Sequence, residues 1–303
     1  MRTDIINQNS SKYVDELTPE TLLEWNYVTC APPMMANVGL GDAAGAVGTG
    51  QVWGVSFPGP RGEVYPCYMT MVGAFTTTGL IPQVQGSIPI VDASATAVGF
   101  NIQLDHETTD NHGMELSIAG SSTVANDANK YVVGVHSGYI DATFHTQDWT
   151  DFDCVSIGFR KVQAHQSGHA AILAAQTGDP LYTDFAAFGI QSVEDVGIST
   201  DLNNGGSGSY QDSGQNAADN HNHRFRVSID SDGAVTYSHI TSQIAGAGTL
   251  AAPTTTASYS FDAGDHIVPY MTTLGNGTAA GTELLLKDIK VVREPYISGH
   301  SRV

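Results

Sequence analysis

The 303-residue sequence is poor in positive charge, cysteine and long apolar runs, and each shortage excludes a class of protein. Its 12 Lys and Arg residues stand against 31 Asp and Glu, which gives a formal net charge of −19 at pH 7. Nucleic-acid binding depends on neutralising phosphates, and anionic membrane surfaces repel so acidic a chain, so we expect neither partner. No apolar run approaches the length of about 18 residues that a membrane-spanning helix requires.

Cysteine is equally scarce. The chain has three, Cys30, Cys67 and Cys154, which are too few for a disulfide framework and too far apart for a metal-binding motif. We interpret them as small buried hydrophobic residues of a protein made in a reducing cytoplasm. The opening residues, MRTDIINQNSSKY, lack the apolar stretch of a secretory signal, which agrees with that interpretation.

The residues that replace the missing charge are those of turns and β-structure. From about residue 80 onward, short runs of alternating or β-branched residues are separated by polar turns. Strands at this spacing, with few helices, predict an all-β sandwich or jelly roll. Besides one hairpin, the predicted strands are 97–104, 113–120, 130–136, 138–146, 152–163, 183–191, 196–200, 258–261, 266–274 and 283–294.

The hairpin is the clearest local signal. Residues 223–230 alternate strictly between apolar and polar side chains, Ser231-Asp232-Gly233 supplies a turn, and residues 234–240 return. Two segments nearby carry no strand pattern. We predict a loop over the polar residues 201–222, and either a helix or a loop over the Ala-rich residues 165–177.

Residues 1–80 differ from the rest and are predicted to form an arm, whereas residues 81–303 form the β-sandwich domain. Thr18-Pro19-Glu20 offers an N-cap, a proline at the first helical position and a carboxylate in the first turn. We therefore predict a short helix over 18–26. A helix of this length is unstable alone and must dock onto another surface.

The arm carries large apolar side chains that it cannot bury by itself. The runs 52–57 and 64–72 are compatible with strands or with an arm that lies over a neighbouring surface. The alternative is that this surface is the parent domain itself, since N-terminal segments often supply edge strands. The predicted assembly contacts are Leu17, Leu22, Leu23, Trp25, Trp53 and Phe57.

No motif for nucleotide, zinc or hydrolase chemistry is complete. Gly39, Gly41 and Gly45 lack a βαβ context, and His165 and His169 lack the glutamate of the HExxH motif. Three further groups of possible metal ligands match neither a calcium loop nor a closed zinc site. They are Asp148, Asp151 and Asp153; Asp219, His221 and His223; and Asp262, Asp265 and His266. We predict no catalytic residue, no cofactor and no metal.

Several strand-and-turn segments resemble those of tailed-bacteriophage structural proteins with a concanavalin A-like jelly roll. The segments are TDNHGMELSIAG, GFRK, FRVSIDSDGAVTY and FDAGDHIVPY, and the resemblance covers residues 90–295. It implies a concanavalin A-like jelly-roll sandwich, here with an N-terminal extended arm that contains the short helix. It also implies a place in a virion.

The resemblance implies a non-enzymatic capsid-decorating, cement or knob protein, made in the host cytoplasm and located on the capsid surface. Its partners would be the major capsid or other virion proteins and further copies of itself in a homo-oligomer. Two alternatives stay open. The concave sheet of this fold can bind sugars, which suits a lectin-like or receptor-binding head-fibre protein with a glycan partner. A glycoside hydrolase is less favoured, because the E-x-D-x-x-E string of family-16 glucanases is absent and fold alone does not imply activity.

Overall fold

The computed structural model describes residues 109–110, 112–117, 130–163, 182–191, 194–202, 208–244, 247–277 and 282–295, together with the backbone of the earlier strands. Within this part of the chain, the only helical element is the short 3-10 helix η2 (Trp149–Asp151). None of the described helical structure has the length and apolar character that crossing a membrane requires.

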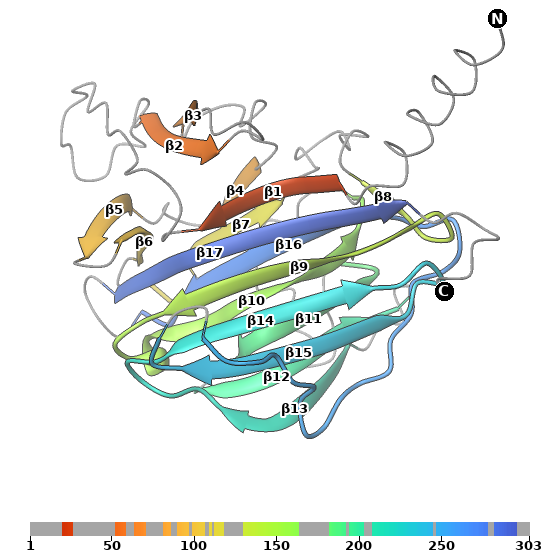
Figure 1. Cartoon of the computed structure of the whole chain (residues 1–303). Coiled ribbons are helices and arrows are strands. Elements are labelled where there is room, and N and C mark those ends of the chain that lie inside the picture. Colours follow the sequence, from red (N-terminus) through yellow and green to blue (C-terminus); the bar gives the residue numbers. More distant parts are fainter. Residues whose placement is uncertain are drawn as a thin grey trace, which may run out of the picture.

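The strands form two antiparallel sheets and one separate hairpin (Figure 1). They are β1 (Glu20–Asn26), β2 (Val52–Pro58), β3 (Val64–Thr70), β4 (Ile81–Gln85), β5 (Ile90–Thr96), β6 (Gly99–His106), β7 (Gly113–Ser117), β8 (Tyr131–Val132), β9 (His136–His145), β10 (Phe152–Lys161), β11 (Phe185–Gln191), β12 (Asp195–Asp201), β13 (Ser209–Asn216), β14 (Asn222–Ile229), β15 (Val235–Ser242), β16 (His266–Gly275) and β17 (Thr282–Pro295).

The seven-stranded sheet has the order β15-β14-β9-β17-β6-β5, with β1 also paired to β17. The eight-stranded sheet has the order β13-β12-β11-β10-β16-β7-β4, with β8 also paired to β16. Figure 1 looks onto the first sheet, and the second lies behind it. Because β16 crosses to lie beside β10 and β17 returns to lie beside β9, the sandwich is a jelly roll. The predicted concanavalin A-like, all-β fold is confirmed.

The main core lies between the two sheets and is built from alternate residues of each strand. Phe188 of β11 meets Phe225 of β14 edge to face, with ring centroids 5.3 Å apart. Trp149 of η2 is fully buried at one end of this core. Each such side chain removed from water contributes about 1.5–3 kcal/mol. Because apolar residues alternate with polar ones along the strands, one face of each sheet is apolar, and burial of these two faces holds the sheets together.

The predicted helix over 18–26 is wrong, because Glu20–Asn26 is strand β1. It pairs antiparallel with residues 288–293 of β17. The helix-start signal of Thr18-Pro19-Glu20 is a local preference worth about 1 kcal/mol. Pairing with β17 instead satisfies backbone groups along the whole segment. Residues 52–58 and 64–70 pair as a two-stranded hairpin, β2–β3.

The predicted loop over 201–222 is also wrong in part, because it contains β13, which pairs with β12. β13 is the edge strand of its sheet and is polar on both faces, so its sequence lacks the alternation that marks a half-buried strand. The predicted strand over 258–261 reduces to an isolated bridge between Ser260 and Ala234. Residues 165–177 lie outside the described residues.

The predicted β14–β15 hairpin is confirmed in register, with Ile229 opposite Val235. Its turn depends on Asp230, whose Oδ1 accepts hydrogen bonds from the backbone N–H groups of Asp232 at 2.9 Å and Ala234 at 2.8 Å. Gly233 adopts φ of 90°, in the left-handed region that favours glycine. A Cβ atom at this position would lie 2.4 Å from the carbonyl oxygen of Phe261.

We therefore expect Gly233→Ala to lower the free energy of unfolding by about 2 kcal/mol or more, because it adds a steric clash to an unfavourable φ. The matched control is Gly264→Ala. Gly264 has nearly the same φ of 89°, but a Cβ there would have no neighbour within 4 Å. This control should cost only about 1 kcal/mol in chemical denaturation. Equal losses in both variants would contradict the steric argument.

Candidate functional site

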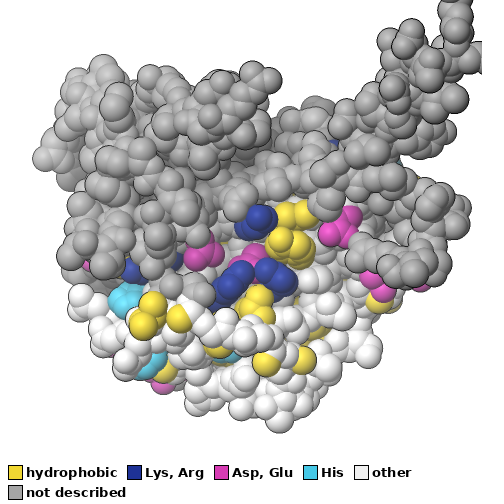
Figure 2. All heavy atoms as spheres, viewed as in Figure 1, with side chains coloured by type: hydrophobic (Ala, Val, Ile, Leu, Met, Phe, Trp, Pro, Cys, Tyr) yellow, Lys and Arg dark blue, Asp and Glu magenta, His cyan; other side chains and the backbone are white. Residues whose placement is uncertain are grey.

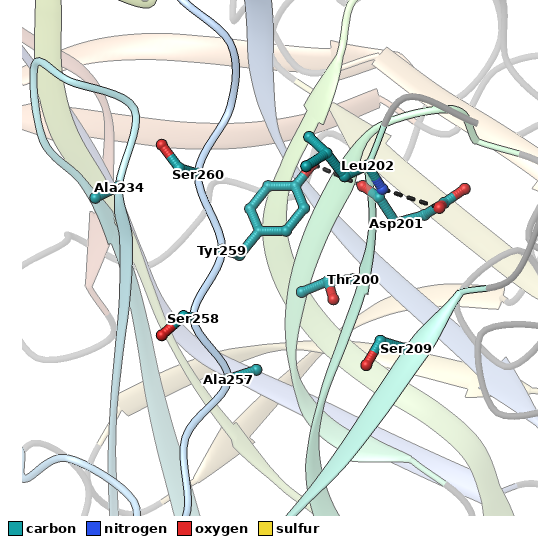
Figure 3. Close-up of a pocket in the computed structure, with 9 residues that line it drawn as sticks. All are labelled: Thr200, Asp201, Leu202, Ser209, Ala234, Ala257, Ser258, Tyr259 and Ser260. Carbon is teal, nitrogen blue, oxygen red and sulfur yellow. Dashed lines mark hydrogen bonds between the residues drawn. The ribbon is translucent and has the colours of Figure 1, made fainter. Parts of the chain in front are cut away.

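The described part of the chain contains an open pocket with a volume of about 630 Å³, shown in Figure 3. The end of β12 and the start of β13 form one wall, and residues 257–260 form the other. Ligand pockets in proteins commonly have volumes of about 300–1,000 Å³. Its size therefore suits a small organic ligand. The nine lining residues are Thr200, Asp201, Leu202, Ser209, Ala234, Ala257, Ser258, Tyr259 and Ser260.

Backbone pairing holds residues 257–260 in place along the β14–β15 turn. The N–H of Val235 donates to the carbonyl of Tyr259 at 2.9 Å, and the N–H of Phe261 donates to the carbonyl of Gly233 at 3.0 Å. Because side chains alternate along an extended chain, neighbouring residues face opposite ways. In Figure 3, Tyr259 points toward β12, whereas Ser258 and Ser260 point to the other side of their segment.

Tyr259 and Asp201 join the two walls. The Tyr259 hydroxyl donates to the backbone carbonyl of Asp201 at 2.6 Å, and the Asp201 carboxylate accepts from the N–H of Leu202 at 2.9 Å. Burial, followed by the charge of Asp184, raises the pKa of Tyr259 well above its usual range, so its hydroxyl stays a neutral donor. Leu202 is 42% exposed at the rim. The hydrogen bond between Tyr259 and Asp201 thus connects the two walls of the pocket, and the apolar side chain of Leu202 lies at its rim.

Several of the nine lining residues carry hydroxyl groups. Ser209, Ser258 and Ser260 are exposed, and Thr200 lies beside Ser209 on the neighbouring strand. The side chains of Ser258 and Ser260 point away from β12, so Ser209 supplies the exposed hydroxyl of the wall that β12 and β13 form. No Lys, Arg or His occurs among the nine lining residues, and Asp201 is their only carboxyl group. Serine hydroxyls both donate and accept hydrogen bonds, so the pocket suits an uncharged ligand that itself carries hydroxyls.

A second constellation, on the other face of the eight-stranded sheet, is fully enclosed. Glu115 of β7 and Arg160 of β10 are 0% and 2% exposed. Oε1 of Glu115 accepts from Nε of Arg160 at 2.9 Å and from Nη2 at 2.7 Å, and Oε2 accepts from the Tyr182 hydroxyl at 2.5 Å. Burial alone would lower the pKa of Arg160, but the nearby negative charge of Glu115 has the larger effect, and the pKa is raised. These groups satisfy one another, so we assign them a structural role.

Two buried histidines form a hydrogen-bonded chain at the β14–β15 pair. His223 Nδ1 lies 3.0 Å from His239 Nε2, and His239 Nδ1 lies 2.9 Å from Gln215 Oε1. The backbone N–H of Ala218 donates to His223 Nε2 at 3.0 Å. Because Nε2 of neutral His223 accepts this hydrogen bond, its proton lies on Nδ1, which donates to Nε2 of His239. Nδ1 of His239 in turn donates to Oε1 of Gln215. Burial lowers the pKa of His223 to about 4 and that of His239 to about 3.

The residues Asp219, His221 and His223, considered above as possible ligands, do not come together as a set, because the His223 ring is hydrogen-bonded to His239. The structure brings together the carboxylates of Asp148, Glu194 and Asp219, all within 4.8 Å of one another. Asp148 accepts from the backbone N–H of Thr150, and Asp219 accepts from that of Trp149. Two of the three carboxylates therefore accept hydrogen bonds from backbone N–H groups of η2, and we do not assign the cluster as a metal site.

The residues of the other two possible ligand groups make contacts with neighbouring side chains and turns. Asp153 faces Asp110, and burial followed by this contact raises the pKa of Asp153 to about 6. Asp265 forms an ion pair with Lys161 at 2.8 Å and accepts from the N–H of Asp262. His266 Nδ1 lies 3.3 Å from Lys130 Nζ. Residues 39–45, His165 and His169 lie outside the described residues.

The predicted assembly contacts occupy two strands. Leu22, Leu23 and Trp25 lie on β1, and Trp53 and Phe57 lie on β2, where the structure describes the backbone. Leu17 lies outside the described residues. Their role in assembly stays a prediction, as does the domain boundary at residue 80.

Sequence reasoning missed His239 and the pocket residues. The inward position of His239 is readable, because it follows Val235 and Tyr237 at alternate positions of β15. The pocket has no comparable signal. It joins residues near 200–209 to residues 257–260, and single serines in polar turns are common everywhere.

A scan against protein-family models and a search of curated protein sequences find no match. Solved structures of similar fold include peanut lectin with a nine-residue peptide, with 14% identity, a TM-score of 0.45, and coverage of 75% of this chain and 96% of the lectin. Lectin II from Ulex europaeus also has 14% identity and a TM-score of 0.45, covering 71% of this chain and 93% of its own. A protein of unknown function from Shewanella oneidensis MR-1 has 10% identity and a TM-score of 0.44, covering 97% of each chain. Likeness at this level concerns the fold and not the function.

Proposed function

We propose that this protein is a non-enzymatic carbohydrate-binding protein that holds an uncharged saccharide in the Tyr259 pocket. The lining of the pocket carries this proposal, because the exposed Ser209 hydroxyl lies near apolar lining groups and none of the nine described lining residues is basic. A sugar ring combines hydroxyls with an apolar C–H face, which matches such a lining. A glycosidase normally needs two carboxyl groups, and the nine described lining residues include one, that of Asp201.

The variant Ser209→Trp should abolish glycan binding, because it places a large ring at the exposed start of β13, inside the pocket wall. The milder variant Ser209→Ala should weaken binding about 2- to 10-fold, the effect of losing one ordinary hydrogen bond. The measurement is a neutral-oligosaccharide array on the full chain, followed by calorimetric titration of the best glycan with each variant.

The matched control is Thr236→Trp, at an exposed position of β15 that does not line the pocket. It should bind the glycan as tightly as the unaltered protein. Binding that survives Ser209→Trp would contradict the pocket, and turnover of a polysaccharide would contradict the non-enzymatic assignment.

We further propose that the domain is displayed on a tailed-phage particle as a decoration, knob or receptor-binding protein. This proposal rests on the sequence resemblance, whose segments are strands and turns of the fold. FRVSIDSDGAVTY forms the β14–β15 hairpin, and FDAGDHIVPY forms a turn that leads into β16. The copy number per particle is the test. Hundreds of copies would indicate shell decoration, a handful would indicate a fibre, and absence from the particle would contradict the proposal.

A further inference from the structure

The side chains on one wall of the Tyr259 pocket form an apolar surface. Side chains alternate along an extended chain, so residues two apart face the same way. In Figure 3, Ala257 and Tyr259 point from their segment toward β12. Ala257 is half-buried and packs against the main core, and Tyr259 is 8% exposed. This wall therefore presents a methyl group and an aromatic ring to the space between the walls.

The opposite wall adds a larger apolar side chain, that of Leu202. It follows β12 directly, lines the pocket and is 42% exposed. Asp201 holds this part of the chain in place, because its carboxylate accepts from the N–H of Leu202 at 2.9 Å and its carbonyl accepts from the Tyr259 hydroxyl at 2.6 Å. The backbone of Leu202 is thus fixed one residue from the point at which Tyr259 joins the two walls.

Exposed hydrophobic residues are ordinary on a protein surface, and position sets Leu202 apart. In Figure 2, hydrophobic side chains on the viewed face lie in small groups among polar side chains and backbone. The described residues include three exposed large hydrophobic side chains, those of Val135, Leu202 and Ile244. Of these three, only Leu202 lines the pocket. A ligand there covers it and removes apolar surface from water, which favours binding.

Ser209 supplies the polar contact beside this apolar surface. It lies at the start of β13 opposite Thr200, and it is exposed whereas Thr200 is buried. Between the walls, the described lining thus offers the exposed Ser209 hydroxyl and the apolar side chains of Leu202, Ala257 and Tyr259. A saccharide with hydroxyl substituents alone would bury some of them against apolar groups without hydrogen-bond partners, which opposes binding.

We propose that the Tyr259 pocket selects neutral saccharides that carry a methyl-bearing substituent, either an acetamido group or the methyl group of a 6-deoxy sugar. The methyl group contacts Leu202 and Ala257, and a ring hydroxyl bonds to Ser209. Leu202 is the specificity-determining residue, because it is the larger and more exposed of the two apolar contacts. This inference rests on the saccharide binding proposed above and names the ligand class of the same pocket.

The test is an NMR titration of the full chain with two matched pairs of free sugars. N-acetylglucosamine is paired with glucose, and L-fucose is paired with L-galactose, so each pair differs at the methyl-bearing substituent. In at least one pair, the methyl-bearing sugar should bind about 3- to 10-fold more tightly than its partner, as burial of one methyl group predicts. Saturation transfer from the protein should be strongest at its methyl protons. The pair with the larger ratio identifies the substituent.

The variant Leu202→Ser should remove this preference, because it takes away the apolar contact and leaves Ser209 in place. It should weaken binding of the methyl-bearing sugar about 3- to 10-fold and change binding of its hydroxyl partner less than about twofold. Ile244→Ser is the matched control, since Ile244 is 69% exposed and does not line the pocket. It should leave both affinities unchanged.

The inference is wrong if glucose and L-galactose bind as tightly as their methyl-bearing partners, or if Leu202→Ser and Ile244→Ser have equal effects. Saccharide binding itself would then still stand. Where free sugars bind too weakly to titrate, the oligosaccharide array decides, because the glycans bound most tightly must carry an acetamido or 6-deoxy group. Absence of binding to every neutral glycan would instead overturn the proposed function, and this inference with it.

Discussion

Between pH 6.5 and pH 5, the buried histidine pair should lower the free energy of unfolding by about 3 kcal/mol. Burial lowers the pKa of His223 to about 4 and that of His239 to about 3, so both stay neutral in the folded protein across this range. In the unfolded chain they take up protons below pH 6.5. The loss of stability therefore begins as the pH falls through the unfolded pKa of 6.5 and continues until the pH reaches their folded pKa values.

Two carboxyl groups act in the opposite direction over the same range. Burial raises the pKa of Asp288 and of Asp153 to about 6, so the folded protein takes up those protons before the unfolded chain does. They stabilise the fold as the pH falls through 6 toward their unfolded values near 4. The histidine effect consequently has to be measured as a difference between variants and not from the unaltered protein alone.

The variant His239→Gln should lose about 2 kcal/mol less than the unaltered protein between pH 6.5 and pH 5, because one of the two titrating histidines is gone. Asp288→Asn should lose more than the unaltered protein, since the opposing group is removed. Urea denaturation at both pH values measures each difference. Thr236→Ala, which removes no titratable group, should follow the unaltered protein. Equal pH dependence in His239→Gln and the unaltered protein would contradict the buried, neutral pair.

Removing Arg160 should destabilise the protein by about 3–5 kcal/mol, because it leaves the Glu115 carboxylate buried without a counter-charge. Arg160→Met keeps most of the side-chain volume, and Glu115→Gln removes the other charge. Each single variant should be strongly destabilised in urea denaturation. The double variant should be more stable than the sum of the two losses predicts, since it leaves no unpaired buried charge.

The neighbouring residue provides the control for this cycle. Lys161 is 35% exposed and pairs with Asp265 at 2.8 Å. Lys161→Met should cost about 1 kcal/mol or less, as is usual for ion pairs that water can reach. Additive losses at Glu115 and Arg160, or a loss at Lys161 as large as at Arg160, would show that burial does not set the strength of the pair.

The sequence by itself determined the elements whose signal is local. Residues 223–240 alternate strictly around an Asp-Gly turn, and the structure has the hairpin in that register. The same alternation places His223 and His239 on the inner face of the sandwich. Side chains two residues apart on a strand share a face, so the order of apolar and polar residues is enough to predict which face is buried.

Only the tertiary structure decided the elements that depend on a distant partner. Glu20–Asn26 became a strand because the edge of β17 was available, against a local helix signal. Glu115 and Arg160 are 45 residues apart, and the two pocket walls are separated by a whole hairpin and its connections. A backbone hydrogen bond or an ion pair forms wherever folding brings the groups together, and nothing in one segment records which distant segment will face it.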